Sequence, residues 1–201
     1  MDDRILAIYE NLYARFGDLD WWPAKTPYEV IVGAVLTQNT AWSNVEKSIA
    51  NWGDNLSPLL VLDAKVTELA EIIRPAGFFN QKAMYLKTVT AWFAKYNFDV
   101  QTVRREPLEK VRRELLALKG IGNETADSIL LYAFGFPTFV VDAYTMRLVE
   151  RLPLQVGTRN YNSTKAFFEK NLPQDAKLFN EYHALIVLHA KAHCQKKPKY
   201  P

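Results

Sequence analysis

Cysteine is almost absent from this sequence: Cys194 is the single cysteine among 201 residues. One thiol excludes an intramolecular disulfide framework, and it cannot by itself hold a cysteine-ligated metal or iron–sulfur cluster. No apolar run approaches the length of about 18 residues that a membrane-spanning helix needs. The acidic, amphipathic segment MDDRILAIYENL is unlike a secretory signal. We therefore expect a reducing, cytoplasmic setting and no membrane partner.

Strong charge of either sign is also missing. The net charge of +3 is too small by itself to indicate a nucleic-acid partner. Its distribution is more informative, because residues 101–120 carry six basic residues against three acidic ones. The C-terminal stretch adds Lys191, Lys196, Lys197 and Lys199. Basic residues clustered in the middle and at the end of the chain indicate a surface that binds a polyanion. The alternative is that they form an ordinary solvated helix face.

What the chain does contain is helical periodicity over nearly its whole length. The pattern predicts about ten helices, short loops and no convincing sheet, without a Gly/Ser linker or a fixed-period repeat. The expected helices lie at 2–16, 28–38, 42–52, a short segment from 58, 66–73, 81–93, 106–117, 124–134, 143–152, 164–171 and 176–193.

Capping residues mark several of the expected helix starts. Thr26 and Glu29 form a capping box around Pro27. This box favours a helix over a buried strand for the apolar run that follows it. The N-caps expected for three later helices are Asn80, Asn123 and Asp142.

The most informative segment is LLALKGIGNETA at 115–126, where a tight turn joins two helices. Gly120 and Gly122 can adopt positive φ and let another backbone approach closely, while Ile121 plugs the space between the helices. The N–H groups of such a turn and of the following helix start can bind a phosphate. A plain helical hairpin with a glycine-rich turn is the alternative, but the basic helix before it favours a DNA-backbone contact.

This hairpin, LKGIGNETADSILLYAFG at 118–135, followed by FVVDAYTMRL at 139–148, resembles the helix-hairpin-helix DNA glycosylases typified by endonuclease III. The segments VLTQNTAWSNVEK, GFFNQKA and HALIVLHAKAHC extend the resemblance over nearly the whole chain. It implies an all-α, two-lobed fold, with a central six-helix lobe at 23–135 and a second lobe from 1–22 plus 136–201. It also implies a nucleoid-associated monomer that binds damaged double-stranded DNA and flips a base out of it.

The resemblance assigns roles to single residues. Asp142 matches the catalytic aspartate, although the residue pattern alone is also that of a plain N-cap. Glu124 stands where bifunctional members carry a nucleophilic lysine, and Glu cannot form the Schiff base of strand cleavage. We therefore predict a monofunctional enzyme. The residues expected to contact DNA phosphates are Lys119, Gly120, Ile121, Gly122, Asn123 and Thr125.

The resemblance also bears on cofactors. The family's iron–sulfur loop needs four cysteines, but here Cys194 is followed by QKKPKYP, and Tyr200 and Pro201 stand near where a second cysteine is expected. We predict no cluster, with natural loss and truncation both open, and a buried or incidental role for Cys194. The backbone carbonyls of 118–122 could hold Na⁺ or K⁺, as the family suggests, and we expect no metal held by side chains.

Two segments, Trp21-Trp22-Pro23 and LTQNTAW at 36–42, look like those of the cluster-free 3-methyladenine glycosylases of endonuclease III type. By this likeness Trp22 and Trp42 sandwich the flipped base, and Gln38 enters the duplex to fill the gap. An alkylated purine is cationic, so it stacks favourably on Trp and leaves readily. Core packing is the alternative for both tryptophans, and core positions are expected for Trp52 and Trp92.

Other interpretations stay open. His183, His189 and His193 share one expected helix; a metal could bind the last two, but structural or surface roles are favoured. The alternative functions are an endonuclease III-like enzyme for oxidised pyrimidines and a non-catalytic DNA-binding relative. An A·G mismatch glycosylase is disfavoured, because the chain lacks the extra C-terminal domain and acidic residue of such enzymes.

Overall fold

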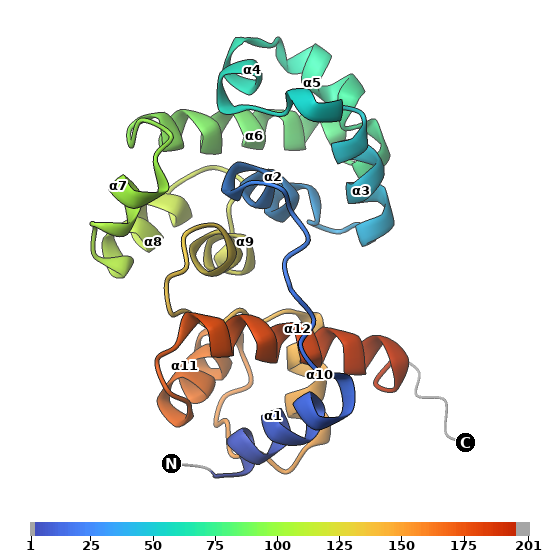
Figure 1. The fold of residues 1–201 in the computed structure, drawn as a ribbon, viewed down its shortest axis with the longest axis vertical. Coiled ribbons are helices and arrows are strands. Elements are labelled where there is room, and N and C mark those ends of the chain that lie inside the picture. Colours follow the sequence, from blue (N-terminus) through green and yellow to red (C-terminus); the bar gives the residue numbers. More distant parts are fainter. Residues whose placement is uncertain (1–2, 196–201) are drawn as a thin grey trace. The chain divides into compact units, whose positions relative to one another are not determined.

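The computed structural model describes residues 3–195, so Lys196, Lys197, Lys199, Tyr200 and Pro201 lie outside the described residues. Within the described range the secondary structure is entirely helical, with twelve α-helices and no strand (Figure 1). The predicted all-α class is therefore confirmed. None of the described helices combines the length and the apolar character needed to cross a membrane.

The backbone contacts divide the chain into two compact units. The hairpin unit comprises 24–136, and the Asp142 unit comprises residues up to 23 together with those from 137 onward. Both boundaries fall one residue beyond those expected from the sequence. The hairpin and Asp142 therefore belong to different units, and each is described by itself below.

The hairpin unit contains eight α-helices, whereas the family resemblance implied six. Three of the eight are short: α4 and α9 have six residues each, and α7 has five. The helix α7 was not predicted, because five residues are too few to show a helical period; Asp99 caps it through the N–H groups of Gln101 and Thr102. The elements are α2 (Pro27–Leu36), α3 (Trp42–Ala50), η1 (Gly53–Asn55), α4 (Pro58–Asp63), α5 (Val66–Ile72), η2 (Arg74–Ala76), α6 (Phe79–Ala94), α7 (Val100–Arg104), α8 (Leu108–Leu116), α9 (Asn123–Ser128) and its π-helical continuation η3 (Ile129–Ala133).

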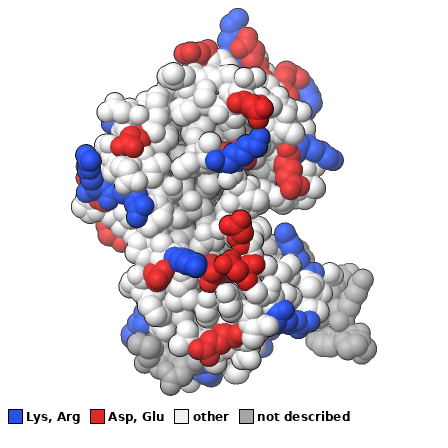
Figure 2. All heavy atoms as spheres, viewed as in Figure 1, with Lys and Arg blue, Asp and Glu red and all other residues white. Residues whose placement is uncertain are grey.

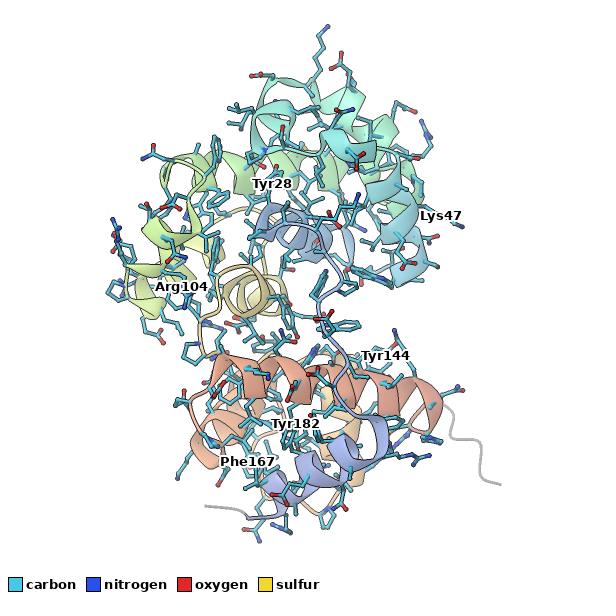
Figure 3. All side chains as sticks on the ribbon, in the orientation of Figure 1. Tyr28, Lys47, Arg104, Tyr144, Phe167 and Tyr182 are labelled. Atoms are coloured by element: carbon cyan, nitrogen blue, oxygen red, sulfur yellow. The ribbon has the colours of Figure 1, made fainter. Side chains whose placement is uncertain are left out.

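The core of this unit is built around α2, which is buried on nearly every side and packs against α6 and η3. Thr26 accepts a hydrogen bond from the Glu29 N–H at 3.1 Å, and Pro27 opens the helix. These contacts confirm a helix for this apolar run, whose residues alone are also compatible with a buried strand. The buried Tyr28, labelled in Figure 3, shares a 2.7 Å hydrogen bond with Thr90 of α6.

Two of the predicted N-caps are wrong. Asn80 is the second residue of α6 and is exposed, because the helix already begins at Phe79 after Phe78 in a left-handed conformation. Asn123 is the first residue of α9, and the N-cap is Gly122, which has no side chain. The Asn123 side chain accepts instead from Arg112 at 3.1 Å, so a partner in the preceding helix has displaced the local capping interaction.

Lys82 of α6 is an unexpected member of the core, with 2% of its surface exposed. Its ammonium group donates to the carbonyl oxygens of Leu36 and Ala76, both at 2.8 Å. Leu36 ends α2 and Ala76 ends η2, so one side chain joins three elements of the unit. Burial lowers the pKa of Lys82 to about 8.

This buried lysine predicts an unusual dependence of stability on pH. The folded state releases the Lys82 proton at a lower pH than the unfolded state, whose ordinary value is 10.5. The penalty for burying the charge is therefore fully present below pH 8 and disappears as the pH rises from 8 to 10.5. Relative to Lys82→Met, the wild type should gain up to about 3 kcal/mol of unfolding free energy over that interval. Urea unfolding of both proteins at several pH values measures the difference, and parallel curves would contradict it.

The Asp142 unit contains α1 (Asp3–Phe16), α10 (Ala143–Arg151), α11 (Tyr161–Asn171) and α12 (Ala176–Ala192). The helix α12 packs against both α1 and α10 (Figure 1). Its Tyr182, labelled in Figure 3, donates to the Ile5 carbonyl at 2.9 Å. Phe139 stacks on Phe168 with ring centroids 4.2 Å apart. The buried extended segment 139–141 is thereby anchored, and it leads directly into Asp142.

Candidate active site and nucleic-acid interface

The turn of the hairpin depends on two glycines that meet different constraints. Gly120 has φ +86°, and a methyl group there would lie 2.3 Å from Cδ1 of Tyr85 on α6. Gly122 has an extended backbone with φ −90°, and nothing lies within 4 Å of the position of a methyl group. Ile121 between them is 5% exposed, as the predicted plug requires. Gly120 is therefore needed by the fold, whereas Gly122 leaves open space at the surface.

An ion pair clamps the two helices of the hairpin together. Arg112 of α8 donates to both carboxylate oxygens of Asp127 on α9, at 2.8 and 3.0 Å. The Asp127 side chain is completely buried. A charge-assisted pair of this two-bond kind has defined geometry, so it sets how α9 leaves the turn. Sequence reasoning missed this pair, although the lone Asp between Ala126 and Ser128 in a buried run is a signal for it.

The first turn of α9 presents backbone N–H groups that no side chain caps, because its N-cap is Gly122. Such groups suit an anion. Lys119 and Glu124 are exposed at this end of the hairpin. Thr125 is only 6% exposed, so it can face a phosphate through its backbone and not through its hydroxyl.

Exposed basic residues surround the hairpin. Two of the six basic residues in 101–120 are paired, Lys110 with Glu106 at 2.8 Å and Arg112 with Asp127. Basic side chains lie over α7 and α8 in Figure 2, in the region where Figure 3 labels Arg104. The remaining four are exposed, namely Arg104, Arg105, Arg113 and Lys119.

Three of the predicted site residues meet at the hairpin. The Gln38 amide donates to the Gly120 carbonyl at 2.9 Å and to the Thr125 hydroxyl at 3.0 Å. Gln38 follows α2, and Trp42 is the half-buried first residue of α3. Gln38 is therefore held against the hairpin in this structure, and entry into a duplex would require both hydrogen bonds to open.

Phe78 is a surface feature that sequence reasoning missed. Its side chain is 64% exposed and its backbone has φ +47°. A non-glycine residue in this region of backbone space is strained, and such strain concentrates at binding sites. Phe78 precedes α6, the helix whose Lys82 is bound to the end of α2. The sequence signal that could have identified this exposed residue is the GFF segment directly before a helix.

Asp142 caps α10, as its position in the sequence predicts. Its Oδ1 accepts hydrogen bonds from Tyr144 N at 2.9 Å, from Thr145 N at 2.7 Å and from Thr145 Oγ1 at 3.0 Å. The carboxylate is nevertheless 13% exposed, and Oδ2 takes no part in the cap. Capping and chemistry are therefore compatible at this residue, because they use different oxygens.

Sequence reasoning assigned His183 a structural or surface role, but the structure places its Nε2 3.6 Å from Asp142 Oδ2. Burial by itself raises the pKa of Asp142. The nearby His183 imidazole and the hydrogen bonds from Thr145 together outweigh burial, so the net pKa of Asp142 is below its ordinary value. The carboxylate is thus held in its ionised form.

Of the four tryptophans considered above, the two that were predicted to lie in the core do so. Trp52 and Trp92 are 4% and 2% exposed, which confirms core positions for both. Trp22 and Trp42 are half-buried and belong to different units. The ring of Trp22 packs against Trp21, with centroids 5.8 Å apart. Both predicted pocket residues thus retain surface that a base could contact.

The remaining polar residues near the C-terminus have local partners. Arg15 and His193 Nε2 lie 2.8 Å apart, and Cys194 is buried with Arg151 2.8 Å from its sulfur. The pKa of His189 is lowered by burial and by the nearby His193 and Arg15. No group of three or more His, Cys, Asp or Glu side chains among residues 3–195 is arranged to hold a metal ion.

The fold and these sites define a class of protein. Residues 32–174 match the model of the HhH-GPD superfamily of base excision DNA repair proteins. The match covers most of the chain, including the second half of α2, the hairpin and Asp142. The chain belongs to this superfamily, and it is a DNA repair glycosylase of the HhH-GPD family.

Several proteins of this kind are similar to the chain over most of its length. A Methanocaldococcus jannaschii protein with the provisional name DNA repair glycosylase MJ1434 is 46% identical over 97% of this chain and 90% of its own length. The solved 3-methyladenine DNA glycosylase MagIII of H. pylori, bound to 1,N6-ethenoadenine, is 30% identical with a TM-score of 0.81, and the match covers 94% of this chain and 96% of that one. A trapped endonuclease III–DNA covalent intermediate has the same fold, with a TM-score of 0.81 at 22% identity over 99% and 91% of the two chains.

Proposed function

We propose that this protein is a monofunctional DNA glycosylase that excises alkylated purines of the 3-methyladenine type and leaves an abasic site. The observation that carries the proposal is the Asp142 carboxylate, ionised, with Oδ1 fixed by the start of α10 and Oδ2 outside the cap. The likeness to MagIII over nearly the full length of both chains supports the substrate class.

The chemistry follows from the carboxylate. The bond between C1′ of deoxyribose and the purine nitrogen breaks, and its electron pair leaves with the base. Positive charge builds on the sugar, where a nearby carboxylate stabilises it. Water then attacks C1′ and loses a proton, which gives the abasic site. A purine that is already cationic departs as a neutral base, so the enzyme needs no strong general acid.

Selection of the base is assigned to Trp22 and Trp42. An electron-rich indole face attracts a cationic base by about 0.5–2 kcal/mol beyond neutral stacking. Both tryptophans are half-buried, which suits a pocket wall better than a core position. Because this preference is small, discrimination against normal bases would rest largely on how readily the base leaves.

DNA binding is assigned to the hairpin and the elements beside it. The N–H groups at Gly122 and Asn123 and the Lys119 ammonium would contact phosphates of any sequence. Gln38 would leave the hairpin to fill the space of the flipped base. The exposed ring of Phe78 is suited to press between bases, as apolar side chains do in kinked duplexes.

Glu124 is the basis for proposing that strand cleavage is absent. A carboxylate cannot form the imine that a nucleophilic lysine forms with the abasic sugar. We propose further that the protein works as a monomer without an iron–sulfur cluster. A Na⁺ or K⁺ ion could bind the backbone carbonyls of 118–122, as the resemblance to the family suggests.

Release of bases from methylated duplex DNA tests the proposal. The wild-type protein should release 3-methyladenine, detected by chromatography, and should release neither thymine glycol nor adenine from A·G mismatches at a comparable rate. The control is the same DNA without methylation. If no methylated purine is released, the alkyl-base assignment is wrong, and release of an oxidised pyrimidine would favour the endonuclease III-like alternative.

Borohydride treatment in the same reactions tests the missing lyase step. A monofunctional enzyme gives no covalent protein–DNA adduct, whereas an imine intermediate is trapped as one. An adduct would show that an amine elsewhere in the chain acts as the nucleophile and that strand cleavage is possible. Absence of both base release and adduct on every substrate, with DNA binding retained, would favour the non-catalytic relative.

A further inference from the structure

The two oxygens of Asp142 have unlike surroundings, and the difference singles out one neighbour. Three hydrogen bonds from Tyr144 and Thr145 occupy Oδ1. His183 Nε2 stands 3.6 Å from Oδ2, which is too long for a direct hydrogen bond but within ion-pair distance. The two side chains are 7% and 13% exposed. An imidazole thus lies beside the oxygen that remains for chemistry.

From this geometry we infer that His183 is a positioning residue, which holds Oδ2 of Asp142 in place and keeps the carboxylate ionised. The inference rests on the proposed catalytic role of Asp142, but it does not depend on which base is excised. His183 itself contacts neither base nor sugar in this scheme, and it acts through Asp142.

The need for such a partner follows from burial. A carboxyl group shielded from water favours its protonated, neutral form. A neutral Asp142 could not stabilise the positive charge that develops on the sugar. Burial is the largest single influence on the pKa of Asp142 and raises it, and the proximity of His183 is the next largest and lowers it. Removal of the imidazole therefore lets the effect of burial dominate.

Several other ionisable groups on the elements around Asp142 have partners elsewhere. The helices α10 and α12 pack against each other, and α12 also packs against α1. On α10, Arg147 lies over the ring of Tyr144 and donates to the Cys194 carbonyl, and Arg151 contacts Cys194. The remaining partnered groups are Glu181 with Tyr9, Tyr182 with Ile5, and Lys165 with Glu169. Among residues 3–195, His183 is the basic side chain for which an ion-pair distance to Asp142 is found.

Single-turnover base release with enzyme in excess, measured from pH 4.5 to 8.5, tests this role. The wild-type rate should stay level toward the acid end, because the pKa of Asp142 lies below its ordinary value. In His183→Leu the acid limb should move up by at least one pH unit, so that the rate at pH 4.5 falls relative to the rate at pH 8 by a larger factor than in the wild type. His183→Gln, whose amide can still donate to Oδ2, should shift less. His193→Gln removes an exposed histidine from the end of the same helix and should leave the profile unchanged.

The ¹³C shift of the Asp142 carboxyl, identified by its loss in Asp142→Asn, gives a readout that needs no catalysis. Its titration midpoint should rise in His183→Leu, and in His183→Gln if the leucine variant does not fold. An unchanged midpoint and an unchanged profile in a folded variant would overturn the inference, as would a loss of rate that is equal at every pH. Wild-type activity in Asp142→Asn would instead refute the proposed catalytic residue, so the two failures are distinguishable.

Discussion

Asp142→Asn is expected to lower the rate of base excision at least about a thousandfold while DNA affinity changes less than about threefold. The amide carries no charge, so it cannot stabilise a cationic sugar. Its oxygen can still accept from the N–H groups of Tyr144 and Thr145, so the cap of α10 should survive. Single-turnover base release and fluorescence anisotropy on the same duplex measure the two quantities.

Asp175→Asn is the matched control for this variant. Asp175 caps α12 through the N–H groups of Lys177 and Leu178 in the same manner, but it is exposed. It should retain wild-type excision. Should Asp142→Asn lose DNA binding and thermal stability in proportion to activity, Asp142 would be a structural cap and the mechanism proposed above would be wrong.

Gly120→Ala and Gly122→Ala are expected to have opposite consequences. A methyl group at Gly120 would overlap the ring of Tyr85 and is disfavoured at φ +86°. Strain and overpacking together should destabilise the protein by about 3 kcal/mol or more. At Gly122 the backbone is extended and the space is open, so stability should change by less than about 1 kcal/mol.

The Gly122→Ala variant should instead lose DNA affinity, because its methyl group occupies the space through which a phosphate reaches the N–H groups of α9. We expect about a tenfold loss, equal on damaged and undamaged duplexes, since phosphates carry no sequence information. Urea unfolding and anisotropy separate the two effects. Selective loss on damaged DNA alone would contradict the backbone-contact role. Tyr85→Ala in the Gly120→Ala background should recover part of the lost stability if the ring is the obstacle.

Much of the fold was readable because its signals are local. The capping box at Thr26 and Glu29 predicted the start of α2, and Asp142 was placed correctly at the start of α10. The turn around Gly120 and Gly122 was also located correctly. Such features depend on residues within one helical turn, so neighbours along the chain contain the needed information.

Other features escaped the local patterns because a distant partner decides them. Asparagine is a common N-cap residue, yet Arg112 of the preceding helix binds the Asn123 side chain. Lysine is usually a surface residue, yet two carbonyl oxygens at the ends of α2 and η2 hold the Lys82 side chain in the core. Neither outcome follows from helical periodicity, which describes the face of a helix and not the polar atoms that meet it.

The sequence by itself determined the helical class, the hairpin, the candidate carboxylate and the absence of a lysine at Glu124, since each depends on residue type and near spacing. Only the tertiary structure decided which groups surround them. It placed His183 beside Asp142 Oδ2, Gln38 on the hairpin and Tyr85 beneath Gly120. These pairs lie far apart along the chain, and their distances are set by the packing of whole helices, which no local pattern encodes.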